Sequence, residues 1–292
     1  MLYDVRLNIT HVYETPAAAS RHMIRVLPKT FAPRQRVNAH LVEILPGPSE
    51  RSELRDFFGN TATSVAHFAP HSRMEIRMAC RVEVQDPGAF IDLSPDLNAI
   101  RTEIAQRRDL GPNSPMHYLG PSPRLTPNSE ISAFAAGQVL SSDSAASTAV
   151  RLGRALHDEI TFDATATTVD TDPLEAFRLR RGVCQDISHI MIIGLRSLGI
   201  PAAYVSGYLR TLPPEGGVRL EGADAMHAWV SAWCGANQGW IEYDPTNATL
   251  VGADHIVVGY GRDYGDVSPV IGHLRASGGQ RSSQSVDVAP AH

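Results

Sequence analysis

Residues 180–189 of this chain read RRGVCQDISH, and an apolar run follows them. From Ile187 onward the apolar residues recur at the spacing of one helical face, at Ile187, Ile190, Met191, Gly194, Leu195 and Leu198. Gly199 and Pro201 then supply helix stop signals. The spacing predicts a helix that begins at or just after Cys184.

A thiol at a helix start lies near the positive end of the helix dipole and near unpaired backbone N–H groups, which favour the thiolate. Three arginines just upstream add positive charge, at Arg178, Arg180 and Arg181. Cys184 is therefore a candidate nucleophile. The alternative for a lone cysteine is a small buried hydrophobe, so a partner base has to decide between them.

Two strand-like segments follow, HAWVSAW at 227–233 and GWIEYD at 239–244, with turn-rich residues between them. A hairpin with a four-residue loop at 234–237 would pair Trp233 with Gln238. This register places the first residue of one segment directly opposite the last residue of the other.

Those two residues are His227 and Asp244. Opposed Cβ atoms in an antiparallel pair are about 5 Å apart, so the carboxylate could accept the imidazole N–H. Cys184, His227 and Asp244 are the residue types of a thiol nucleophile, its base and the group that orients the base.

Several segments, in this order, resemble the transglutaminase-like superfamily of papain-like cysteine enzymes. They are GVCQD at 182–186, LGIPAAYVSGY at 198–208, HAW at 227–229 and GWIEYDPTN at 239–247. The segment GRDYGDVSP at 261–269 looks like one that follows this core in bacterial members. Met226 departs from the pattern, because a small residue such as serine is expected before the histidine.

The resemblance implies an α+β fold, in which a papain-like or transglutaminase-like core packs a helix on a small antiparallel sheet. A β-sandwich-like N-terminal domain is expected before this core. The implied activity is that of a cysteine hydrolase, protease-like or amidase-like, which cleaves peptide or amide bonds through Cys184, His227 and Asp244 and an acyl-thioester. Two alternatives stay open: a transglutaminase-type acyltransferase to an amine, and an inactive peptide-binding module. No metal or organic cofactor is implied.

The domain organisation follows from patterning along the chain. Residues 1–110 are predicted to form the N-terminal β domain, because apolar and polar residues alternate there, and Cys80 lies on an apolar strand face. Residues 111–145 are rich in proline and are predicted to be a linker. The catalytic domain is predicted at 146–275, and the Ser- and Gly-rich residues 276–292 are predicted to be a flexible tail, in which residues 284–288 are a candidate for an added edge strand.

Composition excludes several classes of protein. A hydrophobic fraction of 43%, a charged fraction of 20% and a formal charge of −5 are typical of a soluble globular protein. No basic patch favours nucleic acid, and no apolar run approaches a membrane span. Three widely spaced cysteines and the absence of a signal-like start at residues 1–5 predict the cytoplasm. The expected partner is a peptide, protein or small amide substrate.

Aromatic residues near the predicted base are candidates for substrate contact. Trp229 shares its strand face with the base, and with Tyr208 it is predicted to bind substrate. Trp233 is predicted to fill the core, and Glu242 is predicted to be a solvated strand residue. The proline- and glycine-rich residues 213–217 are predicted to form a loop over a cleft.

The histidines of the first domain also suggest metal binding. His67 and His71 are four residues apart, but Pro70 between them rules out the helix on which that spacing matters. Together with His11, His22 and His40 they are interpreted as surface or packing residues.

Overall fold

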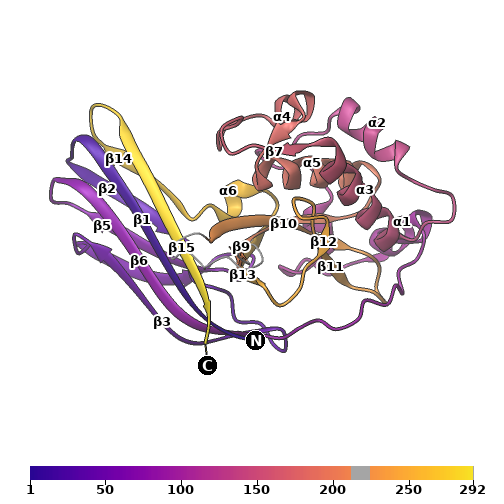
Figure 1. Ribbon diagram of the computed structural model, residues 1–292, viewed down its shortest axis with the longest axis horizontal. Coiled ribbons are helices and arrows are strands. Elements are labelled where there is room, and N and C mark those ends of the chain that lie inside the picture. Colours follow the sequence, from indigo (N-terminus) through magenta and orange to yellow (C-terminus); the bar gives the residue numbers. More distant parts are fainter. Residues whose placement is uncertain (212–223, 292) are drawn as a thin grey trace, which may run out of the picture.

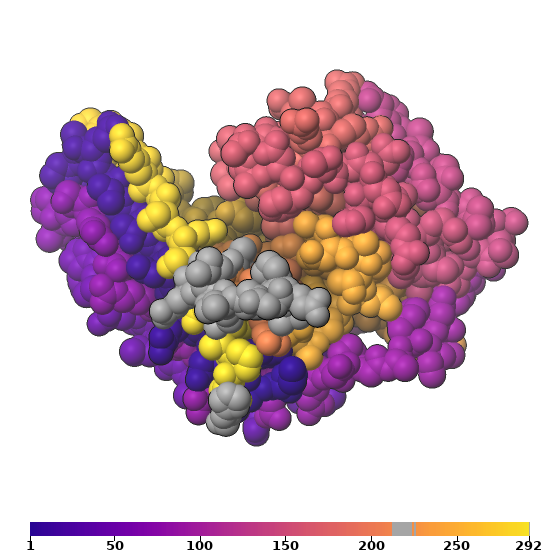
Figure 2. All heavy atoms as spheres, viewed as in Figure 1, coloured from indigo at the N-terminus to yellow at the C-terminus, as the bar shows by residue number. Residues whose placement is uncertain are grey.

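The structure of this chain, a computed structural model, describes residues 1–211 and 224–291. A β-sandwich lies on one side and an α+β unit on the other, and both chain ends lie at the lower end of the sandwich (Figure 1). Figure 2 shows a broad hollow between the two parts. The loop predicted at 213–217 lies outside the described residues.

Two four-stranded antiparallel sheets make up the sandwich. One has the order β15-β1-β6-β3, with β15 (Gln280–Pro290), β1 (Leu2–Ala17), β6 (His71–Val84) and β3 (Gln35–Leu45). The other has the order β14-β2-β5-β4, with β14 (Val270–Arg275), β2 (Ala19–Ile24), β5 (Thr61–His67) and β4 (Glu50–Arg55). The alternation of apolar and polar residues predicted from the sequence is confirmed in β1. Tyr3, Val5 and Leu7 are buried, while Arg6 is exposed. Cys80 is buried among the same core residues, as predicted.

Residues 276–292, predicted to be a flexible tail, instead contribute β15, which pairs with β1 along most of its length and includes the candidate edge strand at 284–288. The composition misled because β15 is the edge strand of its sheet. Of its residues only Val286 and Val288 are buried, and the others are polar except for Ala289 and Pro290 at its end. An exposed edge strand therefore has the composition of a disordered tail.

The α+β unit is built on a five-stranded antiparallel sheet in the order β12-β11-β10-β9-β13. Its strands are β9 (Ala202–Leu209), β10 (Ala225–Trp233), β11 (Trp240–Asp244), β12 (Thr249–Leu250) and β13 (His255–Gly261). The helical elements are α1 (Leu97–Gln106), η1 (Pro115–Tyr118), α2 (Ser129–Gly137), α3 (Ala145–Glu159), α4 (Pro173–Leu179), α5 (Cys184–Ser197) and α6 (Tyr264–Val267). A short parallel pair joins β7 (Thr161–Phe162) and β8 (Arg181–Gly182).

Residues 111–145, predicted to be a linker, contain η1 and α2, and α1 lies within the segment assigned to the first domain. Both α-helices are capped, because the side chains of Asp96 and Asn128 accept backbone N–H groups of the first turn. Ile100 and Ile131 from these helices lie in the core of the α+β unit. Because prolines and glycines flank them, two short helices that pack against the core of the α+β unit were not predicted.

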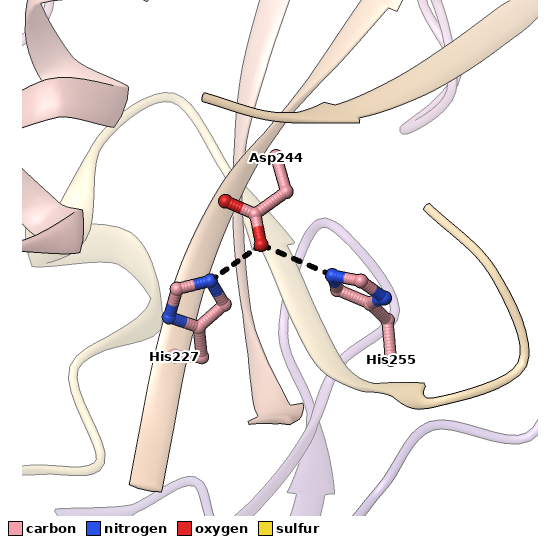
Figure 3. A group of neighbouring side chains, drawn as sticks. All are labelled: His227, Asp244 and His255. Carbon is pink, nitrogen blue, oxygen red and sulfur yellow. Dashed lines mark hydrogen bonds and ion pairs between the residues drawn. The ribbon is translucent and has the colours of Figure 1, made fainter. Parts of the chain in front are cut away.

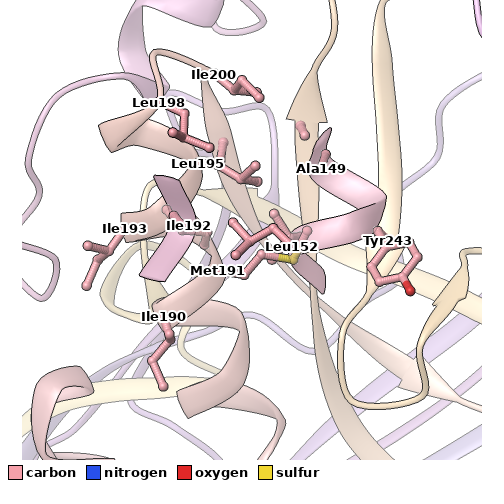
Figure 4. Packing of buried hydrophobic residues seen from close by; sticks show 14 of the residues in the cluster. Ala149, Leu152, Ile190, Met191, Ile192, Ile193, Leu195, Leu198, Ile200 and Tyr243 are labelled. Atoms are coloured by element: carbon pink, nitrogen blue, oxygen red, sulfur yellow. The ribbon is translucent and has the colours of Figure 1, made fainter. Parts of the chain in front are cut away.

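Helix α5 is the centre of this core. It is buried on nearly every side, between helices α2, α3 and α4 and strands β9 and β10. Met191 and Leu195 of α5 pack beside Leu152 of α3 and near Tyr243 of β11 (Figure 4). A Cβ on Gly153 would lie 2.3 Å from the Tyr243 ring, so this close approach of α3 to β11 requires glycine. No helix in the described ranges is long and apolar enough to cross a membrane.

Side-chain amides of the sandwich join the two parts at the edge of β13. Gln35, which is 1% exposed, donates to the carbonyl of Val257 and accepts from its N–H, at 2.7 and 2.8 Å. Asn60 makes the same two-way contact with Tyr260, at 2.8 and 2.9 Å. These amides supply the hydrogen bonds that a neighbouring strand would otherwise make, so the sheet edge is covered from the N-terminal domain.

Three of the five histidines of the first domain pack within the sandwich, whereas His40 is exposed and His11 is partly buried. His22, His67 and His71 are all less than 9% exposed. The His67 ring meets Ser20 Oγ at 3.4 Å and the Pro46 carbonyl at 2.9 Å. Because His67 ends β5 and His71 begins β6, no helix joins them, in agreement with the packing interpretation.

Candidate active site

The thiol of Cys184 lies at the first residue of α5, so the predicted helix start is confirmed. Asp186 holds this start, because its Oδ2 accepts the Val183 N–H at 2.8 Å and the Thr167 hydroxyl at 2.6 Å. A Cβ at Gly182 would lie 2.7 Å from the same oxygen, so glycine is required there. The nucleophile candidate is thus placed by a fixed local structure.

The three upstream arginines have partners of their own. Arg178 pairs with Glu130, Arg180 lies 3.8 Å from Glu159, and Arg181 lies 3.8 Å from Asp163. These carboxylates compensate the positive charge of the arginines, which the sequence analysis expected to favour the thiolate of Cys184. The groups that act on Cys184 are therefore the helix start and the histidine described next.

His227 and Asp244 are brought together as the sequence predicted, with 2.7 Å between Nε2 and Oδ2. The predicted register was nevertheless wrong, because Trp233 pairs with Trp240 rather than with Gln238. A shift of two residues keeps every side chain on its predicted face. The imidazole therefore reaches the carboxylate along the diagonal between the strands instead of directly across.

The thiol completes this arrangement. Burial alone would lower the pKa of His227, but hydrogen bonds with Asp244 and with the Cys184 thiol raise that pKa to about 10. Since Nε2 faces Asp244, Nδ1 is the ring nitrogen left to face the thiol. The order thiol, imidazole, carboxylate allows a proton to pass from sulfur to nitrogen while the carboxylate stabilises the resulting imidazolium.

Asp244 is a hub of hydrogen bonds and is fully buried. Its Oδ1 accepts the backbone N–H groups of Thr246 and Asn247 at 2.9 and 3.2 Å. Its Oδ2 accepts from His227, from the Asn247 amide at 2.7 Å and from His255 Nε2 at 3.1 Å. Burial by itself would raise the pKa of this carboxyl, but the side-chain donors hold it well below its usual range.

Two members of the hub, Asn247 and His255, were not predicted. The sequence DPTN at 244–247 carries a signal for Asn247, because an Asp that accepts from the backbone two and three residues on is a common turn. His255 has no local signal. It opens β13, which is separated from β11 by two strands of the sheet, β10 and β9.

His227, Asp244 and His255 also have the residue types and the spacing of a metal site, since their ligand atoms lie within 4.8 Å of one another. Figure 3 shows, however, that one nitrogen of each imidazole, Nε2 of His227 and Nε2 of His255, points at the same oxygen of Asp244. A metal ion about 2.0 Å along the lone pair of His227 Nε2 would almost coincide with Asp244 Oδ2. The geometry is therefore that of two hydrogen bonds to one carboxylate oxygen rather than that of a metal site.

The two aromatic residues predicted to bind substrate, Tyr208 and Trp229, are both inaccessible to solvent. Tyr208 is fully buried, and its hydroxyl donates to the Val26 carbonyl at 2.6 Å, within the core shared with the sandwich. Trp229 is also fully buried, and its indole N–H donates to Glu242 at 2.7 Å. A Cβ at Gly207 would lie 2.3 Å from the Trp229 ring, so the indole lies tightly across β9. Strand periodicity predicted that Trp229 lies on the same strand face as His227, but it did not predict that Trp229 is fully buried.

Glu242 was predicted to be solvated, and this was wrong. Its side chain is 7% exposed and accepts from Trp229 and from the Tyr260 hydroxyl, the latter at 2.8 Å, while Arg34 lies 3.7 Å away. Trp229 in turn lies beside His227, with ring centroids 6.2 Å apart. Glu242 therefore fixes the position of the Trp229 ring that packs beside His227. Trp233 lies in the core, as predicted.

The environments of the three cysteines predict selective alkylation. Burial raises the pKa of the Cys80 thiol to about 12 and raises that of Cys234 as well, whereas Cys184 is only half-buried. Iodoacetamide at pH 7 is expected to label Cys184 at least about 100-fold faster than either, because only thiolate reacts. Mass spectrometry after limiting reagent measures this, with unfolded protein as the control. Equal labelling of all three thiols in folded protein would contradict the assignment.

The α+β unit has a papain-like fold behind an N-terminal β-sandwich, and the cluster of Cys184, His227 and Asp244 lies within it. The chain belongs to the transglutaminase-like superfamily, whose core matches residues 132–245, while the bacterial transglutaminase-like N-terminal region matches residues 3–83. The family resemblance and the fold class read from the sequence are thereby confirmed.

Similar proteins cover nearly the whole chain. Rv2569c of Mycobacterium tuberculosis is 36% identical over 265 residues, which cover 88% of this chain and 83% of that protein. ML0607 of Mycobacterium leprae is 32% identical over 275 residues, covering 91% and 92%. A solved structure described as a "Putative Cysteine Protease" from Cytophaga hutchinsonii has a TM-score of 0.77 at 19% identity, covering 99% of this chain and 90% of that one. At that identity the match supports the shared fold.

Proposed function

We propose that this protein is a cysteine hydrolase of peptide or amide bonds, with Cys184 as nucleophile, His227 as base and then acid, and Asp244 as the group that orients His227. The observation that carries the proposal is the hydrogen bond of 2.7 Å from the His227 imidazole to the buried Asp244 carboxylate, together with the interaction of that imidazole with the thiol at the start of α5, which raises its pKa. An inactive binding module would have no need of a buried, fully hydrogen-bonded Asp244.

In the proposed mechanism the Cys184 thiol gives its proton to His227, and its sulfur attacks the substrate carbonyl carbon. The C–N bond then breaks, the imidazolium protonates the departing amine, and an acyl-thioester remains on Cys184. His227 next takes a proton from water, the hydroxide attacks the thioester, and the acid leaves as the thiol is restored. The Cys184 backbone N–H, at the first position of the helix, is the natural donor to the oxyanion.

The alternative acceptor is an amine, as in a transglutaminase. An amine at low concentration competes with water only where a channel binds it and excludes water. Trp229 and Tyr208, the aromatic residues that could have lined such a channel, are fully buried and hydrogen-bonded elsewhere. This favours water as the acceptor.

Product partitioning tests the proposal. A mixture of short peptides and small amides in ¹⁸O-labelled water, with a labelled primary amine at millimolar concentration, is expected to give mainly free acid carrying one ¹⁸O. Mass spectrometry measures acid and amine conjugate together, and the Cys184→Ala protein is the control. If the labelled amine is incorporated ahead of water, the acyltransferase replaces the hydrolase.

A further inference from the structure

Asp244 serves two imidazoles through one oxygen. His227 Nε2 lies 2.7 Å from Oδ2 and His255 Nε2 lies 3.1 Å from the same atom. The rings reach it from different strands, β10 and β13, with centroids 6.3 Å apart (Figure 3). A triad of thiol, imidazole and carboxylate needs only the first of these bonds, so the second requires its own explanation.

Packing alone does not explain His255. The residue is 5% exposed, and its ring meets the Trp229 ring edge-on at 5.2 Å. Its Nδ1 is buried and has no hydrogen-bond partner among the described residues. A phenylalanine would make the same aromatic contact without leaving a polar nitrogen unpaired, which is costly in a protein interior. The bond from Nε2 to Asp244 is therefore the polar contact that a histidine provides here.

We propose that His255 is a positioning residue of the active site: by donating its Nε2–H to Asp244 Oδ2, it takes a share of the carboxylate charge and makes the His227 imidazolium a readier proton donor. The inference rests on the proposed thiol chemistry, in which His227 first accepts a proton and then gives it to the departing amine. A hydrogen bond to a charged group stabilises that charge, so each added donor weakens the pull of Asp244 on His227.

The need for such a donor follows from the surroundings of His227. An imidazolium held by an unshared buried carboxylate would keep its proton too firmly, and acid catalysis works best when the pKa of the acid lies near the working pH. The other charged groups around the cluster are already committed. Glu242 accepts from Trp229 and Tyr260, and Asp254 accepts from Tyr3 and Arg210. His255 and Asn247 are thus the side chains that divide the Asp244 charge with His227.

The test is the pKa of His227, followed by ¹⁵N-histidine NMR across pH in the Cys184→Ala protein, where the thiol no longer contributes and no substrate is needed. His255→Phe is expected to raise this pKa by roughly half a unit to one unit, the effect of one lost hydrogen bond to a charge. His255→Gln, which keeps an N–H donor at a similar reach, is expected to stay within a few tenths of the unsubstituted value. His22→Phe, which removes another buried histidine in the sandwich, is the matched control and should cause no shift.

Two results would overturn the proposal. One is a His227 pKa in His255→Phe that equals the control or falls below it. The other is seen without any change at position 255: if the ¹⁵N shifts place the His255 proton on Nδ1 at neutral pH, Nε2 cannot donate to Asp244. This second measurement decides the question even if His255→Phe fails to fold. Neither readout depends on hydrolysis, so a chain that released no acid could still confirm or refute the role of His255.

Discussion

Replacement of Cys184 by alanine is expected to lower the rate of hydrolysis by about 10⁶-fold, the scale seen when the nucleophile of a comparable triad is removed. The loss follows because the variant lacks the sulfur that attacks the carbonyl carbon. In the proposed acylation step His227 and Asp244 act only on the proton of this thiol. Release of acid from the best substrate, timed with excess enzyme, measures the rate.

The matched controls for this loss are Cys80→Ala and Cys234→Ala. Both thiols are buried in the apolar cores, so these variants are expected to lose some stability but to keep their turnover. The melting temperature of the Cys184→Ala protein should stay close to that of the original chain, since the side chain is half-buried at a helix start. A Cys184→Ala protein that retained more than about 1% of the rate would exclude the thioester route.

The site was predictable to the extent that its signals are local. The apolar spacing after Ile187 fixed the start of α5, and period-two alternation fixed the strand faces of His227 and Asp244. Even the wrong hairpin register preserved their contact, because the shift was two residues rather than one. A shift of one residue would have sent the imidazole to the opposite face of the sheet.

The unpredicted parts depend on contacts between distant segments. His255 reaches Asp244 only because β13 joins the far side of β9, and β15 is ordered only because β1 lies beside it. Burial depth likewise comes from tertiary packing: Glu242, Trp229 and Tyr208 have strand-like spacing, but the sandwich and β13 enclose them. Their side chains are therefore buried, and Glu242 and Trp229 pack behind His227.

Replacement of Asp244 by asparagine is expected to lower turnover by about 10⁴-fold, because the amide reverses the hydrogen bond on which the base depends. An Asn Nδ2 in place of Oδ2 donates to His227 Nε2 rather than accepting from it. The proton of the neutral imidazole then moves to Nδ1, the nitrogen that must take the thiol proton. The loss should appear in kcat, with the binding of substrate nearly unchanged.

Asp143→Asn is the matched control, since that carboxylate is also largely buried, at 7% exposed, and accepts two bonds from Arg151. It lies before α3, outside the cluster, so its loss should cost stability without changing the chemistry. Thermal unfolding of both variants at pH 7 separates the two effects.

Because the Asp244 pKa is held low, this carboxylate stabilises the fold above the unfolded carboxyl pKa of about 3.9, and that contribution is lost only as the pH falls through the lower folded value. If Asp244→Asn turns over substrate as fast as Asp143→Asn while His227→Ala is inactive, another group orients the imidazole, and Asn247, 3.5 Å from His227 Nε2, would be the next residue to test.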